Sequence, residues 1–238
     1  ALLAGGGYAE YVACPEYLAI RKPLELDWAE SASIPEVYAT CWLNLFIEAQ
    51  MHEGDKVVFH AGASGIGTAG IQLAKAFGCK SFITAGTKKK VDFCLKLGAS
   101  EGEIRSKSIF EKIKNWAPDG VDIILDPVGG DYFENNLSIL GLEGRLIIIG
   151  LMGGASANIN LGRLMMKRHK VIGSTIRARD LATKSKVMSD LENKVLPLFK
   201  KKQLKPIVHE VLAFSECQKA HRIMEANENI GKIILDLN

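Results

Sequence analysis

The sequence predicts an α/β protein built on a doubly wound parallel sheet. Short apolar runs alternate with amphipathic stretches from residue 56 to residue 176, which is typical of parallel strands joined by helices. The first apolar run, 56–60, leads into a glycine-rich turn and then into a helical pattern. This layout is typical of a βαβ unit that binds a dinucleotide.

The individual elements follow from the same patterns. A helix is expected over 35–48, and the alternating pattern of 9–13 predicts a strand near the start of the chain. The central alternation predicts strands at 56–60, 80–85, 101–104, 121–126, 144–150 and 171–176, and helices at 65–77, 88–97, 108–116 and 132–140. After it we expect a helix over 180–202, a strand over 207–211, a helix over 215–228 that Ser215 and Gln218 would cap, and a strand over 231–237.

The length of 238 residues allows one large domain, or one domain with part of another. Several prolines interrupt residues 1–35, and no helix long enough to cover a hydrophobic core is expected there. The dinucleotide unit is expected over 36–178. Residues 179–238 are then expected to pack on the first segment.

Composition excludes several functional classes. Hydrophobic residues make up 47% and charged residues 24%, and the net charge is +3, as in ordinary globular enzymes and unlike nucleic-acid-binding proteins. No apolar run has the length of a transmembrane helix, and no secretory signal is visible, so a cytoplasmic protein is expected. The five cysteines are scattered, which favours free thiols and no metal site.

The glycine turn has two possible registers. Gly65, Gly67 and Gly70 match G-x-G-x-x-G literally, but they would place the turn inside the helix. We prefer a turn over 61–65, where Gly62 and Gly65 let the backbone approach a pyrophosphate, with Gly67 packing the helix on the strand. The helix beginning near Ser64 would direct free N–H groups at that phosphate. The alternative is a glycine-rich turn that binds nothing.

The end of the second strand indicates which dinucleotide is bound. NAD-specific sites usually carry an Asp or Glu there, whose carboxylate accepts from the ribose 2′-OH. This chain has Ala85 and Gly86 instead. Three lysines follow at 88–90 and would attract a 2′-phosphate, so we predict NADPH. Alternatively, these lysines form the first turn of a helix and are exposed to solvent without binding a ligand. Arg105 either reaches the phosphate or faces solvent.

The sequence identifies no catalytic acid. His60 ends the first strand of the βαβ unit, beside the predicted cofactor turn. A histidine in this position is more often a packed neighbour than a catalyst. The five histidines are dispersed and form no cluster with the cysteines.

Five motifs occur together in the order and spacing of one family. They are Leu3-Ala-Gly-Gly-Gly-Tyr-Ala-Glu-Tyr-Val12, Ser33-Ile-Pro-Glu36, His60-Ala-Gly-Ala-Ser-Gly-Ile-Gly-Thr-Ala69, Gly150-Leu-Met-Gly-Gly154 and Met224-Glu-Ala-Asn-Glu-Asn-Ile-Gly-Lys-Ile233. With these motifs the chain resembles the medium-chain dehydrogenase/reductase superfamily, in its zinc-free quinone oxidoreductase branch, close to the tumour-suppressor-induced and zeta-crystallin-like group.

The resemblance implies a Rossmann domain inserted into a GroES-like domain that both chain ends form. It implies metal-free hydride transfer from NADPH to quinones or related conjugated carbonyls, in a homodimer or homotetramer. A 2-alkenal or enoyl reductase and a non-catalytic NADPH-binding protein are the alternatives. Arg105 stands where a tyrosine is common in this branch. The cofactor contacts that the resemblance implies are Thr40, Ser64, Gly65, Ile66, Gly86, Lys90, Met152 and Asn229.

Family members carry the first half of the GroES-like domain before the position that matches Ala1. That half usually lines the substrate pocket. We therefore expect a fragment or a shortened isoform, which keeps the cofactor site and lacks much of the substrate site.

Overall fold

The computed structural model describes residues 1–237, which divide into two compact units. The sheet unit comprises residues 44–63 and 70–174. The terminal unit comprises residues 1–43 and 64–69 and the chain from residue 175 onward. The chain therefore contributes three separate segments to the terminal unit.

The sheet unit contains six parallel strands in the order β3-β2-β1-β4-β5-β6, so the predicted doubly wound α/β fold is confirmed. Val58 of β1 lies opposite Phe82 on one side and opposite Ile124 on the other. The strand order reverses here, and ligands of such sheets bind outside the carboxyl ends of the strands at the reversal. The strands are β1 (Lys56–Phe59), β2 (Lys80–Ala85), β3 (Glu101–Ile104), β4 (Val121–Asp126), β5 (Leu140–Ile148) and β6 (Lys170–Gly173).

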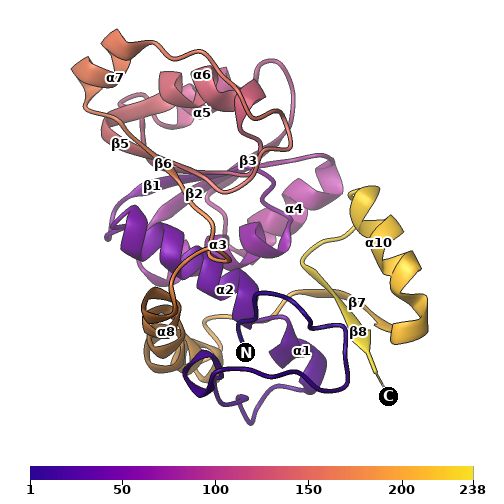
Figure 1. The fold of residues 1–238 in the computed structure, drawn as a ribbon. Helices are drawn as coiled ribbons and strands as arrows, with labels where there is room; N and C mark the ends of the chain where they lie inside the picture. The colour runs from indigo at the N-terminus through magenta and orange to yellow at the C-terminus, as the bar shows by residue number, and fades with distance from the viewer. Residues whose placement is uncertain (238) are drawn as a thin grey trace. The chain divides into compact units, whose positions relative to one another are not determined.

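Helices cover both faces of this sheet. Figure 1 shows α5 and α6 on one face and α4 on the other. Apolar side chains of α5 and α6 pack on the sheet in a core that includes Val58, Phe82, Ile113, Leu137 and Leu146. The helices of this part of the chain are α3 (Gly65–Ala76), α4 (Lys88–Leu97), α5 (Ile109–Trp116), α6 (Gly130–Ile139) and α7 (Leu161–Lys167).

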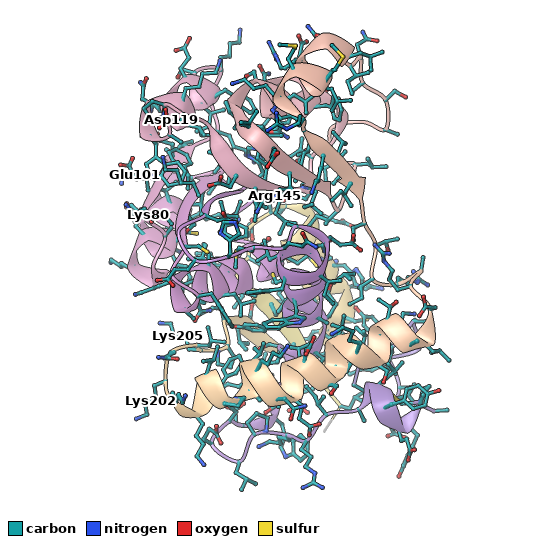
Figure 2. The ribbon with its side chains drawn as sticks, turned by 90° about the vertical axis from the view of Figure 1, so that its left-hand side faces the viewer. Lys80, Glu101, Asp119, Arg145, Lys202 and Lys205 are labelled. Carbon is teal, nitrogen blue, oxygen red and sulfur yellow. The ribbon has the colours of Figure 1, made fainter. Side chains whose placement is uncertain are left out.

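The burial of each strand follows its place in the sheet. The central strands β1, β2 and β4 are almost continuously buried, whereas the edge strands β3 and β6 are mostly exposed. A parallel strand covered on both faces needs an unbroken apolar run, which explains why the central strands were recognisable in the sequence. Lys80 and Glu101, which begin β2 and β3, lie on the same side of the sheet unit (Figure 2).

β5 begins four residues earlier than its apolar run predicts. Leu140 already pairs with Val121, and the register then shifts before Ile123. Glu143 has a φ of 60° and interrupts the regular strand. The residues before Gly144 are therefore a bent extension, and the alternation of apolar residues does not reveal it.

The terminal unit has a two-stranded parallel sheet of β7 (Val208–Ala213) and β8 (Lys232–Asp236). Its assignment as part of a GroES-like domain stays a prediction. The other elements of this unit are the short helix η1 (Glu16–Leu18), α1 (Trp28–Ala32), α2 (Pro35–Cys41), the π-helical η2 (Trp42–Glu48), which continues into the sheet unit, α8 (Leu181–Asp190), the π-helical η3 (Leu191–Val195), α9 (Leu196–Lys200), η4 (Phe214–Glu216) and α10 (Cys217–Glu225).

The predicted strand at 9–13 is wrong. This segment has no regular structure, and Tyr11 is 90% exposed. An alternating pattern becomes a strand only where another strand offers hydrogen bonds, and no strand of the described residues pairs with this one.

The predicted helix over 180–202 divides into α8, η3 and α9. Pro197 lies in the first turn of α9, where its missing N–H is tolerated. The predicted cap of the later helix is also wrong. α10 begins at Cys217, and Glu216 stands at its N-cap without a side-chain capping bond.

Candidate dinucleotide-binding site

The glycine turn follows β1 at the carboxyl edge of the sheet. Ala61 takes a φ of 55°, and the Gly62 N–H donates to the Thr84 carbonyl at 2.9 Å. Ser64 then caps the helix, because its Oγ accepts from the Gly67 N–H at 3.1 Å. α3 begins at Gly65, so the predicted turn over 61–65 is confirmed.

Gly70 allows the helix to pack closely on the strand. A Cβ at Gly70 would lie 2.5 Å from the Phe59 ring, so Gly70 lets α3 approach β1. The same role for Gly67 stays a prediction. Gly62 is also required, since a Cβ there would lie 2.6 Å from the Ile83 Cβ.

A cationic corner, formed by Gly86, Lys90 and Arg105, lies at the end of β2. The Arg105 N–H donates to the Ala85 carbonyl at 2.9 Å, and its guanidinium lies 3.1 Å from where a Cβ of Gly86 would be. Partial burial and then the charge of Arg105 lower the pKa of Lys90. The structure therefore brings three of the predicted site residues together, with two cations close enough to affect each other.

The three lysines at the start of α4 differ in their surroundings. Thr87 caps the helix by accepting from the Lys90 N–H at 3.3 Å. Lys88 forms an ion pair with Asp92, one helical turn further on, and Lys89 is exposed. Lys90 is partly buried, and it lies near enough to Arg105 for that charge to lower its pKa. This difference makes Lys90 the lysine best placed for an anion at the corner.

A buried polar chain, formed by Thr84, His60, Asn136 and Asp126, connects the ends of the central strands. His60 Nδ1 lies 3.1 Å from Thr84 Oγ1, and His60 Nε2 lies 2.8 Å from Asn136 Oδ1. Asn136 Nδ2 donates to Asp126 Oδ2 at 2.9 Å. All four side chains are buried.

Burial sets the charge state of His60. It lowers the pKa of the imidazole to about 4, although the hydrogen bond to Asn136 opposes the shift. Burial likewise raises the pKa of Asp126, against three donors that stabilise its carboxylate. His60 is therefore a neutral, packed residue, as the sequence favoured, and it is not exposed to a substrate.

Sequence reasoning missed the other three members of the polar chain. Thr84 and Asp126 are polar residues at the ends of apolar strands, and this signal could have identified them. No sequence pattern identified Asn136, because the rotation of α6 about its axis decides whether this side chain faces the strands.

Met152 lies in the loop after β5, which is tied to the turn after β4. Its N–H donates to the Pro127 carbonyl at 3.2 Å, and the Gly153 N–H donates to the Val128 carbonyl at 2.7 Å. The side chain of Met152 is 67% exposed. The loop is therefore fixed by its backbone while this side chain is available for contact.

The remaining predicted residues belong to the terminal unit. Thr40 is buried and donates to Glu36 Oε1 at 3.0 Å, and the Ile66 carbonyl accepts from Cys41 Sγ at 3.2 Å. Asn229 donates to the Gly231 carbonyl at 2.9 Å, and Gly231 forms a β-bridge with Ser64. Ser64, Gly65 and Ile66 thus lie in the same unit as Thr40 and Asn229.

No helix of residues 1–237 has the length and apolar character that crossing a membrane requires. The five cysteines are free thiols, and Cys41, Cys79 and Cys94 are buried.

The chain matches a family model and several known proteins. The model of the zinc-binding dehydrogenase family matches residues 65–193. Human quinone oxidoreductase is 33% identical over 173 residues, which are 72% of this chain and 52% of that protein. The squalestatin tetraketide synthase of Phoma sp. is 28% identical over 98% of this chain and 9% of its own length.

Among solved structures, the quinone oxidoreductase of Thermus thermophilus, which was also solved in complex with NADPH, is 31% identical with a TM-score of 0.86. The match covers all of this chain and 76% of that one. The chain spans about half the length of the human relative and a tenth or less of the synthase.

The family description implies zinc, and the described residues do not fit it. No three histidine, cysteine, aspartate or glutamate side chains among residues 1–237 are grouped so that they could hold a metal ion. Three findings nevertheless indicate the same family. They are the family model, the doubly wound sheet and the match along the whole chain to the Thermus enzyme. The chain belongs to the zinc-binding dehydrogenase family, within the quinone oxidoreductase branch of the medium-chain dehydrogenase/reductase superfamily.

Proposed function

We propose that this chain binds NADPH and provides the cofactor-binding part of an NADPH-dependent quinone oxidoreductase. The cationic corner is the observation that carries the proposal. A carboxylate at this point would bind the 2′-OH of NAD and repel a phosphate, and the chain has Gly86 there with Lys90 and Arg105 beside it. Two neighbouring cations repel each other, and a 2′-phosphate between them would relieve that repulsion.

The glycine turn supports the same proposal. Gly62 and Gly65 carry no side chain at the turn, and the N-terminus of α3, which begins at Gly65, favours a pyrophosphate. We propose Met152 as a contact from the loop after β5. In the terminal unit we propose Thr40, Ser64, Gly65, Ile66 and Asn229 as contacts.

The bound dinucleotide would supply the hydride, and the residues named above would bind and orient it. We assign no side chain as a proton donor. A quinone accepts a hydride readily, so the protein's main contribution is orientation and the exclusion of water. We also propose that residues 1–35 and 179–238 belong to a GroES-like domain and that the protein is a homodimer or homotetramer.

The proposal is tested by titrating the protein with NADPH and NADH. We expect NADPH to bind at least about tenfold more tightly, which is about 1.4 kcal/mol. Lys90→Ala should reduce this ratio, whereas the exposed neighbour Lys89→Ala should leave it unchanged. Equal affinities for the two cofactors in the wild-type protein would reject the assignment.

A second candidate is a 2-alkenal or enoyl reductase, because the JamJ enoyl reductase shares this fold, with a TM-score of 0.81 over 93% of this chain. Both activities need the same cofactor site. The kcat/KM values of the whole protein, measured with an ortho-quinone and with a 2-alkenal, would separate them. Binding of NADPH without turnover of either substrate would instead favour a non-catalytic NADPH-binding protein.

A further inference from the structure

The buried polar chain adds side-chain hydrogen bonds between the turns that follow the neighbouring strands β1 and β4. His60 immediately precedes the glycine turn, and its N–H donates to the Leu125 carbonyl of β4 at 3.2 Å. At the other end, Asp126 accepts from the Val128 N–H at 2.7 Å and from the Gly129 N–H at 3.1 Å. The side chains of the polar chain therefore hold the turn after β1 and the turn after β4 in one arrangement.

The hydrogen bonds of the buried polar chain all run in one direction, from Thr84 to Asn136 and Asp126, once the donors and acceptors are assigned. Asp126 is an acceptor at both oxygens, so Asn136 must direct its amide nitrogen at Asp126 and its oxygen at His60. His60 then donates through Nε2, and its Nδ1 accepts from the Thr84 hydroxyl. Asn136 is the member that fits both neighbours, because it supplies one donor and one acceptor.

The arrangement extends beyond the turn after β4. The carbonyls of Pro127 and Val128 accept from Met152 and Gly153, and the Gly130 N–H donates to the Gly154 carbonyl at 2.9 Å. The loop 150–154 is thereby fixed to the turn that Asp126 and Asn136 organise. A Cβ at Gly130 would lie 2.7 Å from the Ser156 carbonyl oxygen, so the contact is close.

We propose that Asn136 is a positioning residue for dinucleotide binding, which holds the glycine turn and the loop 150–154 in register through His60 and Asp126. The proposal rests on the function proposed above. Asn136 does not itself contact the dinucleotide, since it is fully buried behind the strand ends. Its effect on binding is exerted through the two loops.

Asn136→Leu tests this role, because leucine has a similar size and neither donates nor accepts. We expect the NADPH dissociation constant to rise about tenfold, in line with the loss of paired buried polar groups. Asn135→Leu is the matched control. Asn135 is exposed in the same helix, so its replacement should change the dissociation constant by less than about twofold.

Hydrogen exchange separates positioning from general destabilisation. In Asn136→Leu, amides in both 60–65 and 150–154 should exchange faster, while amides of the core helix α5 keep their protection. A uniform loss of protection, or unchanged exchange in 150–154, would overturn the proposal. This measurement needs no ligand, so it remains decisive if wild-type protein fails to bind NADPH and the proposed function is wrong.

A pair of His60 variants provides the rescue test and covers the case in which Asn136→Leu does not fold. His60→Gln can still donate to Asn136, whereas His60→Phe retains a ring beside Phe110 and Tyr132 and cannot donate. We expect His60→Gln to bind NADPH within about threefold of wild type and His60→Phe to bind about tenfold more weakly. Equal affinities of the two variants would contradict the role of this hydrogen bond.

Discussion

Arg145 Nη2 donates to Asp55 Oδ2 at 2.7 Å, and this ion pair connects β5 to the residue that precedes β1. Asp55 is 2% exposed and Arg145 13%. Arg145 also donates through Nε to the Ala49 carbonyl at 3.0 Å, and the Asp55 carboxylate accepts from the His52 N–H at 3.2 Å. The pair therefore joins three segments of the sheet unit (Figure 2 labels Arg145).

Removing one partner of this pair should destabilise the protein strongly. Arg145→Met removes the guanidinium from the buried Asp55 carboxylate, and we expect a loss of about 3 kcal/mol or more in the free energy of unfolding. Urea denaturation measures it. Arg168→Met breaks the exposed pair with Glu143 and should cost less than about 1 kcal/mol. Similar losses in the two variants would show that the buried pair contributes no more than the exposed one.

The close approach of α3 to β1 gives a prediction about Gly70. Gly70→Ala would place a methyl group 2.5 Å from the Phe59 ring. Overpacking of this kind costs about 1–3 kcal/mol, which exceeds the gain of up to about 1 kcal/mol from replacing a helical glycine. Thermal denaturation should therefore show a lower midpoint. Adding Phe59→Leu should recover part of the loss, and a simple sum of the two losses would contradict the contact.

Local patterns predicted the sheet well where the connections are short and the strands are buried. The buried strands at 80–85 and 121–126 and the helix at 88–97 have the predicted ends, since apolar runs and a helix cap fix them locally. The strand at 101–104 also has the predicted ends, although no apolar run marks it. The segment 9–13 has an equally clear pattern and forms no strand. Whether this segment forms a strand depends on the presence of a partner strand, and a local sequence pattern contains no information about that partner.

In the site, too, some features follow from local sequence patterns and others depend on how the elements pack. Its residues at strand ends follow from the order of strands and helices, because every parallel strand delivers its carboxyl end to one edge. The close contact between Gly70 and the Phe59 ring depends on the rotation of α3 against β1. The pairing of Asn136 with His60 likewise depends on how α6 lies on the sheet. Such relationships arise only when the elements pack.

Reversing the charge at Arg105 should change the cofactor preference. Arg105→Glu places a carboxylate beside Gly86 and Lys90, where it would repel a 2′-phosphate and accept from a ribose 2′-OH. We expect the ratio of NADPH to NADH affinity to fall about a hundredfold, which is about 2.7 kcal/mol. Arg105→Gln should cause a smaller decrease. An unchanged ratio in Arg105→Glu would show that Arg105 faces solvent and does not contribute to the site.

The buried His60 predicts a specific loss of stability in mild acid. Its pKa is about 4 in the folded protein and about 6.5 when the chain is unfolded, so the unfolded state binds the proton more strongly. The stability contribution of neutral His60 is complete above pH 6.5 and is lost as the pH falls toward 4. The expected decrease in the free energy of unfolding is about 2 kcal/mol between pH 7 and pH 5. Asp126, whose pKa is raised, acts in the opposite direction at lower pH. The difference between wild type and His60→Gln therefore isolates the histidine, and parallel pH profiles of the two proteins would show that His60 is not responsible.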